Sequence, residues 1–524
     1  MIPTVMEIPL TVCEVLEGQG RSAAPDKTAI VDGHRRVTYR ELRTRSEHYA
    51  VVLTRAGVRK GDRVGIFLRR SVEAAAALFG TWSAGGVAVI VNETLRTAQV
   101  QHILDHSEAT CVITDDRQLR AVRDFPCPVI NMDRLELVEH ESVPVSGIGA
   151  DLAALIYTSG STGLPKGVML SHDNLRSGME IVSRYLHLTG QDVILSLLPF
   201  SFDYGLNQLL TACHAGATLV IQRSLFPPDI CRTIQEEKVT GVAGVPTLWL
   251  QLTGRASPFL KSACPTLRYI TNSGGRLPEQ TVRAIRAAHP QTQIYLMYGL
   301  TEAFRSTFLA PEEVDRRPAS MGRAIPNVEI LVVDGDGRRC APGEVGELVH
   351  RGANISIGYW RDPAATSRVF RPHPFQECRQ GRHEVVVYSG DMVTADTEGF
   401  LYYVGRKDMQ IKSRGFRVSP EEIERCVHSS NLVAQVVAFA APRHDGDTDI
   451  VAAVVPHDPL GFHPAALEAF CRHEMPEYMQ PRAIWPMVDV PLTTSGKPDR
   501  PAIQEMYAEY VASARTAAAA ARTA

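Results

Sequence analysis

The chain has 524 residues, of which 44% are hydrophobic and 22% charged, and its formal net charge is −3. These values are typical of a globular protein with more than one domain, and they exclude a general basic surface for nucleic acid. The ten cysteines include no Cys-x-x-Cys pair, so neither a zinc site nor a disulfide scaffold is expected and a reducing cytoplasm is favoured. The N-terminus has no basic, apolar leader, and Gly85-Gly86 interrupts the low-charge stretch 74–91, so no membrane span is expected.

Short apolar runs alternate with helix-like runs along most of the chain, which predicts an α/β fold with mostly parallel sheets. The strand-like runs are Arg63–Phe67, Gly86–Val91, Ala109–Thr114, Val193–Leu197, Thr218–Ile221, Gly241–Val245, Leu267–Thr271 and Gln293–Met297. Around Val328–Val333 and Gly346–His350 the runs become short strands with glycine-rich turns, which predicts a small β-barrel-like part.

A loop rich in hydroxyls and glycines follows the apolar run Leu152–Tyr157. Such a loop is often only a flexible turn, but hydroxyls, bare backbone N–H groups and one lysine together suit the oxygens of a phosphate chain. The lysine follows a proline and precedes a second apolar run, so this is not the P-loop of nucleotide triphosphatases. We expect a phosphate clamp between two strands, and then a helix capped by Ser171. The residues of the clamp are Thr158, Ser159, Gly160, Ser161, Thr162, Gly163 and Lys166.

A second cluster, YLMYGLTEA, ends the strand-like run near Tyr295. The ring of Tyr298 can stack on a purine, the hydroxyl of Thr301 can hold a phosphate oxygen, and Glu302 can carry Mg²⁺. The alternative is a turn in which Thr301 caps a helix and Glu302 lies in its first turn.

Three further motifs lie in the last third of the chain. They are YSGDMV with Asp391, GRKD from Arg406 to Asp408, and PLTTSGKPDR with Lys497. Singly, each is compatible with a surface turn. Ser419 and Pro420 predict a capped helix start, so we place a boundary near Asp408 that separates a domain of residues 1–407 from a small α+β lid of residues 408–524.

In this order and spacing, the five motifs resemble the adenylate-forming superfamily, which includes acyl-CoA synthetases, adenylation domains of peptide synthetases and firefly luciferase. The resemblance extends from Glu14 to Pro501. It implies a large N-terminal domain of stacked α/β subdomains, a mobile C-terminal lid, and the cofactors ATP and Mg²⁺. It also implies that a carboxylic acid is activated to an acyl-AMP with release of pyrophosphate, and is then transferred to the phosphopantetheine thiol of CoA or of a free-standing carrier protein.

The resemblance also implies roles for individual residues. The clamp residues hold the β- and γ-phosphates, with Lys166, Thr301, Glu302 and Lys497 as the catalytic set and Glu302 as the metal ligand. Lys497 contacts the substrate carboxylate and the α-phosphate. Other nucleotide contacts fall on Ser273, Gly274, Gly275, Arg276, Tyr298, Gly299, Asp391 and Arg406, and the hinge and thiol channel on Asp408, Lys412 and Gly415.

The acyl pocket is implied by the stretch PFSFDYGLNQLL, where Asp203 stands at the position at which amino-acid-activating domains carry an aspartate for the ammonium group. The alternative is an aspartate that caps the following helix. Arg305 can bind a side-chain carboxylate, or it can be an exposed ion-pair partner. The other candidates are Tyr204, Asn207, Ala243, Thr271, Ser273, Met297 and Ser306, a small and polar lining.

We therefore predict an AMP-forming acid–thiol ligase for an amino acid or a small polar acyl substrate. The sequence GLTEAFRSTF also resembles that of acyl-CoA ligases associated with exosortase systems. Alternatives are a medium- or long-chain acyl-CoA synthetase, a luciferase-like adenylate oxidase, and a kinase or ATPase.

Overall fold

The computed structural model describes residues 11–16, 25–135, 147–158, 165–376, 384–407, 409, 411–413, 416–442, 448–475, 477, 479–493 and 496–523. The chain forms two compact units. The larger consists of residues 1–331 and 349–389, and the smaller of residues 332–348 and 390–524.

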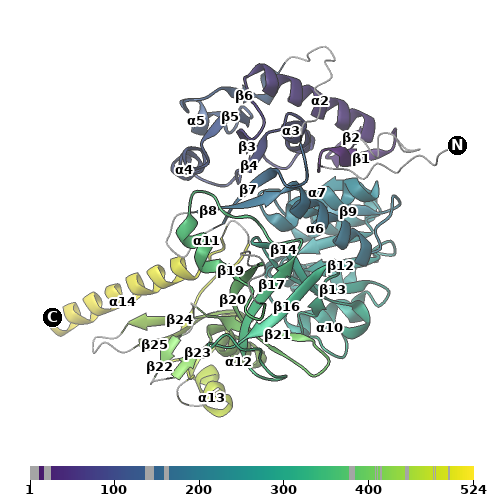
Figure 1. Cartoon of the computed structure of the whole chain (residues 1–524). Helices are drawn as coiled ribbons and strands as arrows, with labels where there is room; N and C mark the ends of the chain where they lie inside the picture. The colour runs from purple at the N-terminus through teal and green to yellow at the C-terminus, as the bar shows by residue number, and fades with distance from the viewer. Residues whose placement is uncertain are drawn as a thin grey trace. The chain divides into compact units, whose positions relative to one another are not determined.

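A nine-stranded sheet lies at the centre of the larger unit (Figure 1). Six of its strands, β13, β12, β11, β9, β10 and β1, run parallel to one another. The strands at its two edges, β15 and β14 on one side and β2 on the other, pair antiparallel with their neighbours. In sheet order they are β15 (Arg323–Ala324), β14 (Ala303–Leu309), β13 (Gln293–Leu300), β12 (Tyr269–Asn272), β11 (Gly241–Gly244), β9 (Val193–Ser196), β10 (Thr218–Ile221), β1 (Thr28–Asp32) and β2 (Arg35–Thr38).

A second, seven-stranded sheet carries the apolar runs on either side of the expected phosphate clamp. In sheet order its strands are β18 (Gly358–Tyr359), β8 (Lys166–Ser171), β7 (Leu152–Thr158), β4 (Val87–Ile90), β3 (Arg63–Phe67), β5 (Ala109–Thr114) and β6 (Val129–Asn131). β7 and β8 are the two strands that the sequence predicts on either side of the clamp, and they pair antiparallel.

One hydrophobic core joins the two sheets. It contains apolar side chains of both sheets, of residues 12–16 and of the helices α2 (Tyr39–Arg55), α3 (Val72–Ser83), α6 (His172–Tyr185) and α7 (Asp203–Ala215). α6 begins at the predicted cap, where the Ser171 side chain accepts a hydrogen bond from the N–H of Asn174. Burial on both faces explains why these parallel strands are continuous apolar runs.

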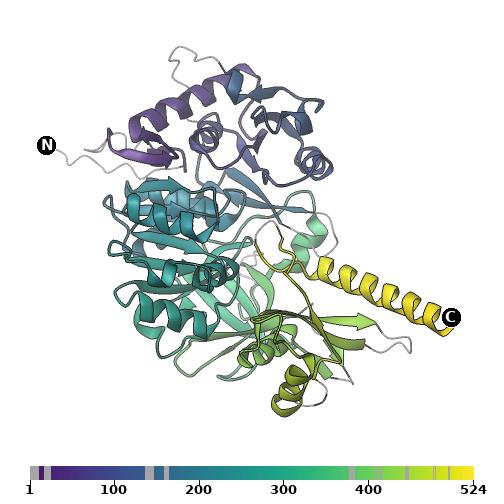
Figure 2. The same ribbon diagram turned by 180° about the vertical axis from the view of Figure 1, so that it is seen from behind.

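The remaining helices of the larger unit are amphipathic and cover outer surfaces. They are α4 (Thr97–Ser107), α5 (Leu119–Val122), α8 (Pro227–Glu236), α9 (Pro246–Thr253), α10 (Glu279–Ala288) and α11 (Pro363–Val369), and short 3₁₀ turns lie at Met132–Arg134, Phe259–Lys261 and Pro311–Glu313. From behind, the teal helices between residues 227 and 288 lie on one face of the nine-stranded sheet (Figure 2).

The predicted short strands belong to a five-stranded sheet. It contains β16 (Val328–Val333), β17 (Gly346–Gly352), β20 (Val385–Ala395), β19 (Phe370–Pro372) and β21 (Leu401–Arg406). Asp391, which the sequence places in a turn, lies inside the long strand β20.

The smaller unit also has an α+β core of its own. Its elements are β22 (Ile411–Ser413), β23 (Phe416–Val418), α12 (Pro420–Ser429), β24 (Val433–Pro442), β25 (Thr448–Pro456), α13 (Pro464–Glu474), β26 (Ala483–Pro486) and α14 (Arg500–Thr523). α12 starts with Pro420 as predicted, but the Ser419 side chain does not cap the helix, because its hydroxyl donates to the Val404 carbonyl and contacts Glu421. The boundary near Asp408 that the motifs suggest for a mobile lid stays a prediction.

Candidate active site

The carboxyl ends of parallel strands gather most of the candidate residues at one edge of the nine-stranded sheet. Residues at or just beyond the ends of β9, β11, β12 and β13 meet there, because these strands run in one direction. In such sheets, ligands bind in the crevice outside the carboxyl ends of the strands. The candidates placed at this edge are Asp203, Tyr204, Asn207, Ala243, Thr271, Ser273, Gly274, Gly275, Arg276, Met297, Tyr298, Gly299 and Thr301.

The turn after β12 exposes its backbone. Gly274 has a φ of +81°, a left-handed conformation that favours glycine. The Asn272 side chain donates to the Gly275 carbonyl over 2.9 Å and holds the turn closed. Arg276 pairs with Glu279 at 3.3 Å, so its guanidinium is partly engaged within α10. Because glycine has no side chain, the backbone of this turn can lie close to a flat ligand.

Tyr298 lies where β13 and β14 form a hairpin, so the helix of the alternative interpretation is absent. Its ring stacks on His350 of β17, with centroids 6.0 Å apart and planes 14° apart. His350 is 1% exposed, and neither ring nitrogen has a hydrogen-bond partner among the described residues. Burial lowers the pKa of His350 to about 3, so the ring is neutral and supports Tyr298 as a flat surface.

Glu302 and Thr301 form the tip of the same hairpin. Thr301 is buried, whereas Glu302 is half-buried. The Tyr359 hydroxyl donates to Oε1 of Glu302 over 2.6 Å, and the Glu302 carbonyl accepts from the N–H of Ser356 over 2.9 Å. These contacts fix the carboxylate and its backbone.

Lys166 begins β8, directly opposite Thr158 at the end of β7. Its Nζ lies 3.4 Å from an Asp362 carboxylate oxygen and 5.7 Å from the centre of the Tyr359 ring. Tyr359 therefore contacts Lys166 and Glu302 at the same time. The other clamp residues, Ser159, Gly160, Ser161, Thr162 and Gly163, lie outside the described residues.

Tyr359, Asp362 and His350 were missed by the sequence interpretation. Asp362 caps α11 by accepting from the N–H of Ala365 over 2.8 Å, and this bond, followed by Lys166, lowers the pKa of its carboxyl. The run Gly-Tyr-Trp-Arg-Asp-Pro, with its cap and proline, could have marked the segment. Nothing local marks His350, a single histidine within β17, whose sequence is GELVHRG.

The candidate acyl pocket contains a buried pair of opposite charges. Asp203 is the first residue of α7, with no side-chain capping bond at the helix start, so the capping alternative is wrong. Nη2 of Arg305 lies 3.7 Å from Oδ2 of Asp203, and the two side chains are 3% and 5% exposed. Arg305 is therefore not an exposed ion-pair partner, and Asn207 and Ser306 are also buried beside these elements.

Two buried hydroxyls line the same region. The Tyr204 hydroxyl is hydrogen-bonded to the Thr271 hydroxyl, and the Tyr185 hydroxyl contacts the Met297 sulfur over 3.0 Å. Burial raises the pKa of Tyr204 well above its usual value, so this hydroxyl stays protonated. The Tyr204 hydroxyl already has a hydrogen-bond partner in Thr271. The charged pair of Asp203 and Arg305 is therefore the part of this lining that can bind a charged substrate group.

The smaller unit carries three further candidates. Asp391 and Arg406 face each other across β20 and β21, with Nη1 of Arg406 3.1 Å from Oδ1 of Asp391. Lys497 is exposed on a turn in which the Thr493 N–H donates to the Lys497 carbonyl over 2.7 Å. Asp408 and Gly415 lie outside the described residues, as does the side chain of Lys412.

The donor set suits a magnesium ion bound with a phosphate ligand. Within the described ranges, no three His, Cys, Asp or Glu side chains are grouped to hold a metal ion. Magnesium keeps several waters and needs only one or two carboxylates beside substrate phosphates. Glu302 fits this requirement, because Tyr359 occupies Oε1 and leaves Oε2 for the ion.

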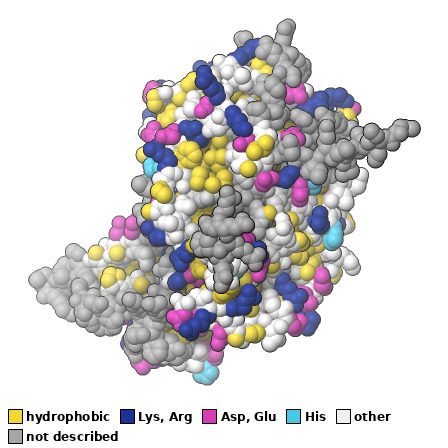
Figure 3. Space-filling model, in the orientation of Figure 1, with side chains coloured by type: hydrophobic (Ala, Val, Ile, Leu, Met, Phe, Trp, Pro, Cys, Tyr) yellow, Lys and Arg dark blue, Asp and Glu magenta, His cyan; other side chains and the backbone are white. Residues whose placement is uncertain are grey.

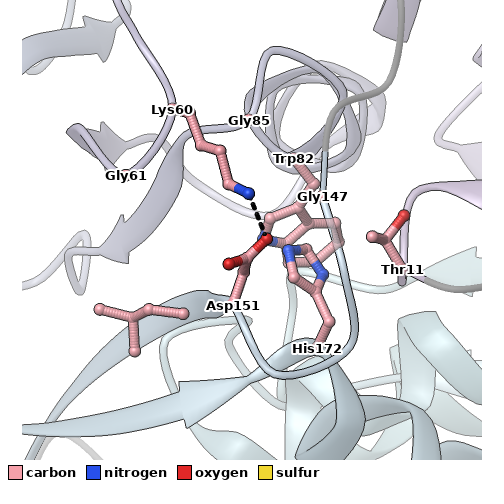
Figure 4. A pocket seen from close by; sticks show the side chains of 9 residues that line it. Thr11, Lys60, Gly61, Trp82, Gly85, Gly147, Asp151 and His172 are labelled. Carbon is pink, nitrogen blue, oxygen red and sulfur yellow. Dashed lines mark ion pairs between the residues drawn. The ribbon is translucent and has the colours of Figure 1, made fainter.

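A small cavity of about 60 Å³ lies at the opposite end of β7 from Thr158 (Figure 4). Lys60 Nζ pairs there with Oδ2 of Asp151 at 2.8 Å, beside His172 and Trp82. Nδ1 of His172 accepts a hydrogen bond from the N–H of Val12 over 3.3 Å. The cavity borders the docked N-terminal segment and is separate from the candidate active site.

Among the described residues, none of the helices combines the length and apolar character needed to cross a bilayer. Lys and Arg side chains are interspersed with Asp and Glu on the face drawn in Figure 3, which fits the small net charge.

Residues 19–360 match the family described as AMP-binding enzyme, and residues 422–497 match its C-terminal domain. Among curated proteins, a linear gramicidin synthase of Brevibacillus parabrevis is 30% identical over 510 residues, which cover 95% of this chain and 10% of that protein. The chain thus spans about a tenth of the length of this curated relative.

Two solved structures share the fold and 26% of the sequence. The o-succinylbenzoate CoA synthetase of Bacillus subtilis, in complex with its acyl-adenylate intermediate, has a TM-score of 0.83 and covers 94% of this chain and 98% of its own. ATP-bound MatB from Rhodopseudomonas palustris has a TM-score of 0.84, covering 94% and 99%.

Proposed function

Because the chain belongs to the AMP-binding enzyme family, we propose that it activates a carboxylic acid with ATP and passes the acyl group to a thiol. The acid is an amino acid or a small polar acyl compound. The acceptor is a phosphopantetheine thiol, carried by CoA or by a separate carrier protein. The observation that carries the proposal is the convergence of Lys166 and Glu302 on Tyr359.

The first step joins the acid to AMP. A carboxylate oxygen attacks the α-phosphorus, an oxygen–phosphorus bond forms, and the bond to the bridging oxygen of pyrophosphate breaks. Both reactants are anions, so cations and oriented N–H groups must neutralise the charge that develops. We assign Lys166 and the clamp to the leaving pyrophosphate, Thr301 to a phosphate oxygen and Lys497 to the α-phosphate side.

Several residues hold the nucleotide in this proposal. Tyr298, supported by the neutral His350 ring, flanks the adenine, and the turn Ser273–Arg276 forms the other side of that pocket. Asp391, with Arg406 beside it, accepts from the ribose hydroxyls. Magnesium at Glu302, when bound, supplies positive charge to the phosphates.

The second step transfers the acyl group. The thiol sulfur bonds to the acyl carbon, the anhydride bond to AMP breaks, and AMP leaves with its oxygen while the thiol proton is released to solvent. We assign Asp408 to the hinge of the lid, and Lys412 and Gly415 to the thiol channel. An acyl-adenylate hydrolyses in water, so a closing lid also protects it.

Carboxylate-dependent ATP–pyrophosphate exchange tests the proposal. With the correct acid we expect the label of added pyrophosphate to enter ATP. When a thiol acceptor is also present, we expect AMP and pyrophosphate to accumulate in equal amounts. Formation of ADP or phosphate would indicate a kinase or ATPase instead. Oxygen uptake or light in step with AMP formation would indicate an adenylate oxidase, and a preference for medium or long acyl chains would contradict the substrate class while preserving the reaction.

A further inference from the structure

We propose, on the basis of the function above, that the activated acid is an amino dicarboxylate, whose ammonium group is bound by Asp203 and whose second carboxylate is bound by Arg305. The two residues lie on different elements, at the start of α7 and in β14. Three features of their environment lead to this substrate class.

The first feature is the backbone of Arg305. Its φ is +76°, a left-handed conformation that a residue with a Cβ rarely adopts. Gly299 on the opposite strand leaves room for it, because a Cβ at position 299 would lie 3.1 Å from the Arg305 Cα and 3.5 Å from its Nη1. Such conformations persist where the surrounding structure imposes them, often at binding sites.

The second feature is the set of unused donors on Arg305. Its Nε and Nη2 are buried and have no hydrogen-bond partner among the described residues. The guanidinium lies 4.7 Å from the centre of the Tyr204 ring and 5.4 Å from that of Phe304, so aromatic faces hold it in place. Nε and Nη2 form one edge of the guanidinium, which matches the two oxygens of a carboxylate.

The third feature is Asp203, which is 4% exposed. In the described part of the chain its carboxylate accepts no side-chain or backbone hydrogen bond, and the 3.7 Å to Arg305 exceeds hydrogen-bond distance. Asn207, one helical turn further along α7, also has a buried Nδ2 with no hydrogen-bond partner among the residues that the structure describes. A buried carboxylate in this state requires a donor such as an ammonium group.

Charge balance selects among the acids that fit. Asp203 and Arg305 together carry no net charge, so the part of the substrate that does not react should also carry one cation and one anion. A neutral amino acid would satisfy Asp203 and leave the Arg305 edge empty, whereas a plain dicarboxylate would leave Asp203 without a donor. A fatty acid would leave both charges buried without hydrogen bonds, which is costly.

The test is pyrophosphate exchange by the full chain with matched acids: aspartate and glutamate, their amides asparagine and glutamine, their deaminated forms succinate and glutarate, and alanine and hexanoate. We expect at least one amino dicarboxylate to exceed its own amide and its own deaminated form by about 100-fold in kcat/KM. Arg305 should favour the amino dicarboxylate over its amide, because the guanidinium binds a carboxylate more strongly than a neutral amide. Asp203 should favour it over the deaminated acid, because that acid has no ammonium group to pair with Asp203.

Two variants should gain activity with a different acid, a result that misfolding cannot produce. Arg305→Gln should reverse the preference toward the amide, and Asp203→Asn should reverse it toward the deaminated dicarboxylate. Arg317→Gln, which removes an arginine of the same unit paired with Glu313, is the control and should keep the wild-type order. Better exchange with alanine or hexanoate than with any amino dicarboxylate would overturn the inference and leave the proposed function standing, whereas exchange with no acid would overturn both.

Discussion

The Tyr359 hydroxyl donates a hydrogen bond of 2.6 Å to Oε1 of Glu302, and its ring lies 5.7 Å from Nζ of Lys166. β18, which carries Tyr359, pairs with β8, which begins with Lys166. One tyrosine thus contacts both the expected metal ligand and the expected phosphate-binding cation. The geometry makes Tyr359 a positioning residue for both.

Tyr359→Phe should lower the exchange rate at limiting magnesium while changing the stability of the fold little. A hydrogen bond to a charged group contributes about 1.5–3 kcal/mol, so kcat/KM for ATP should fall about tenfold or more at limiting magnesium. High magnesium should restore part of this loss, because the ion itself can orient a free carboxylate. The measurement is exchange rate against magnesium concentration, and an unchanged magnesium dependence would contradict the positioning role.

Asp362→Asn should strengthen ATP binding. Lys166 and Asp362 are 20% and 32% exposed, and an ion pair of this kind is worth about 0.2–1 kcal/mol. Asn can still cap α11, so the change removes charge and preserves the helix start. We expect ATP to bind up to about fivefold more tightly by calorimetry. Weaker binding would show that Asp362 supports Lys166 in the nucleotide-bound state instead of competing with the phosphates.

The strands and the order of the motifs were predictable because buried parallel strands are continuous apolar runs that end at turn residues. The expected run Val193–Leu197 agrees with β9 to within one residue, whereas Gln293–Met297 continues to Leu300, because the hairpin with β14 pairs the chain beyond Tyr298. Serine is a residue type that often caps helices, but the Ser419 hydroxyl instead donates a hydrogen bond to the Val404 carbonyl.

The contacts between distant segments were not predictable from local pattern. Tyr359 and Glu302 meet because β18 and the β13–β14 hairpin converge, and neither neighbourhood indicates the other. The motif positions suggested that both Asp203 and Arg305 lie at the acyl pocket, yet only the structure places them as neighbours. Only the structure, too, leaves Nε and Nη2 of Arg305 without a hydrogen-bond partner in the described part of the chain. The stack of Tyr298 on His350 is another contact between distant segments that the local sequence does not predict.

Acidification should destabilise the larger unit through two buried histidines. Burial lowers the pKa of His350 to about 3 and that of His172 to about 4, from 6.5. Below pH 6.5 the unfolded chain binds more protons than the folded chain, so stability present at neutral pH is lost as the pH falls toward these values. At pH 5.5 each residue should cost about 1.4 kcal/mol.

Urea unfolding at pH 7.5 and 5.5 checks this expectation. His350→Phe keeps a ring against Tyr298, and His172→Asn keeps an acceptor for the Val12 N–H, so each should reduce the acid-induced loss by about 1.4 kcal/mol. A loss of the same size in both variants and in the wild type would show that other groups cause the acid sensitivity.

Lys497→Ala should separate the two half-reactions. The turn that carries Lys497 is closed by the Gly496 N–H, which donates to the Thr493 carbonyl over 2.9 Å, and by the Lys497 N–H, which donates to the Thr493 hydroxyl over 3.2 Å. Both bonds use the backbone of residues 496 and 497, so alanine preserves the turn and removes only the cation. Loss of a cation at a developing charge costs about 3–4 kcal/mol, so adenylation should fall about 100- to 1,000-fold.

In the proposed function the lid turns about its hinge at Asp408 between the two half-reactions and withdraws Lys497, so the thiol attacks the acyl-adenylate without this cation. Thioester formation from supplied acyl-AMP should therefore stay within a few-fold of wild type, as followed by chromatography of the thioester product. Lys407→Ala is a matched control, since this exposed lysine of the same unit pairs with Glu347 at 2.8 Å. Equal losses in both half-reactions of Lys497→Ala, with the Lys407 variant unaffected, would remove Lys497 from the adenylation step and assign it to the structure of the lid.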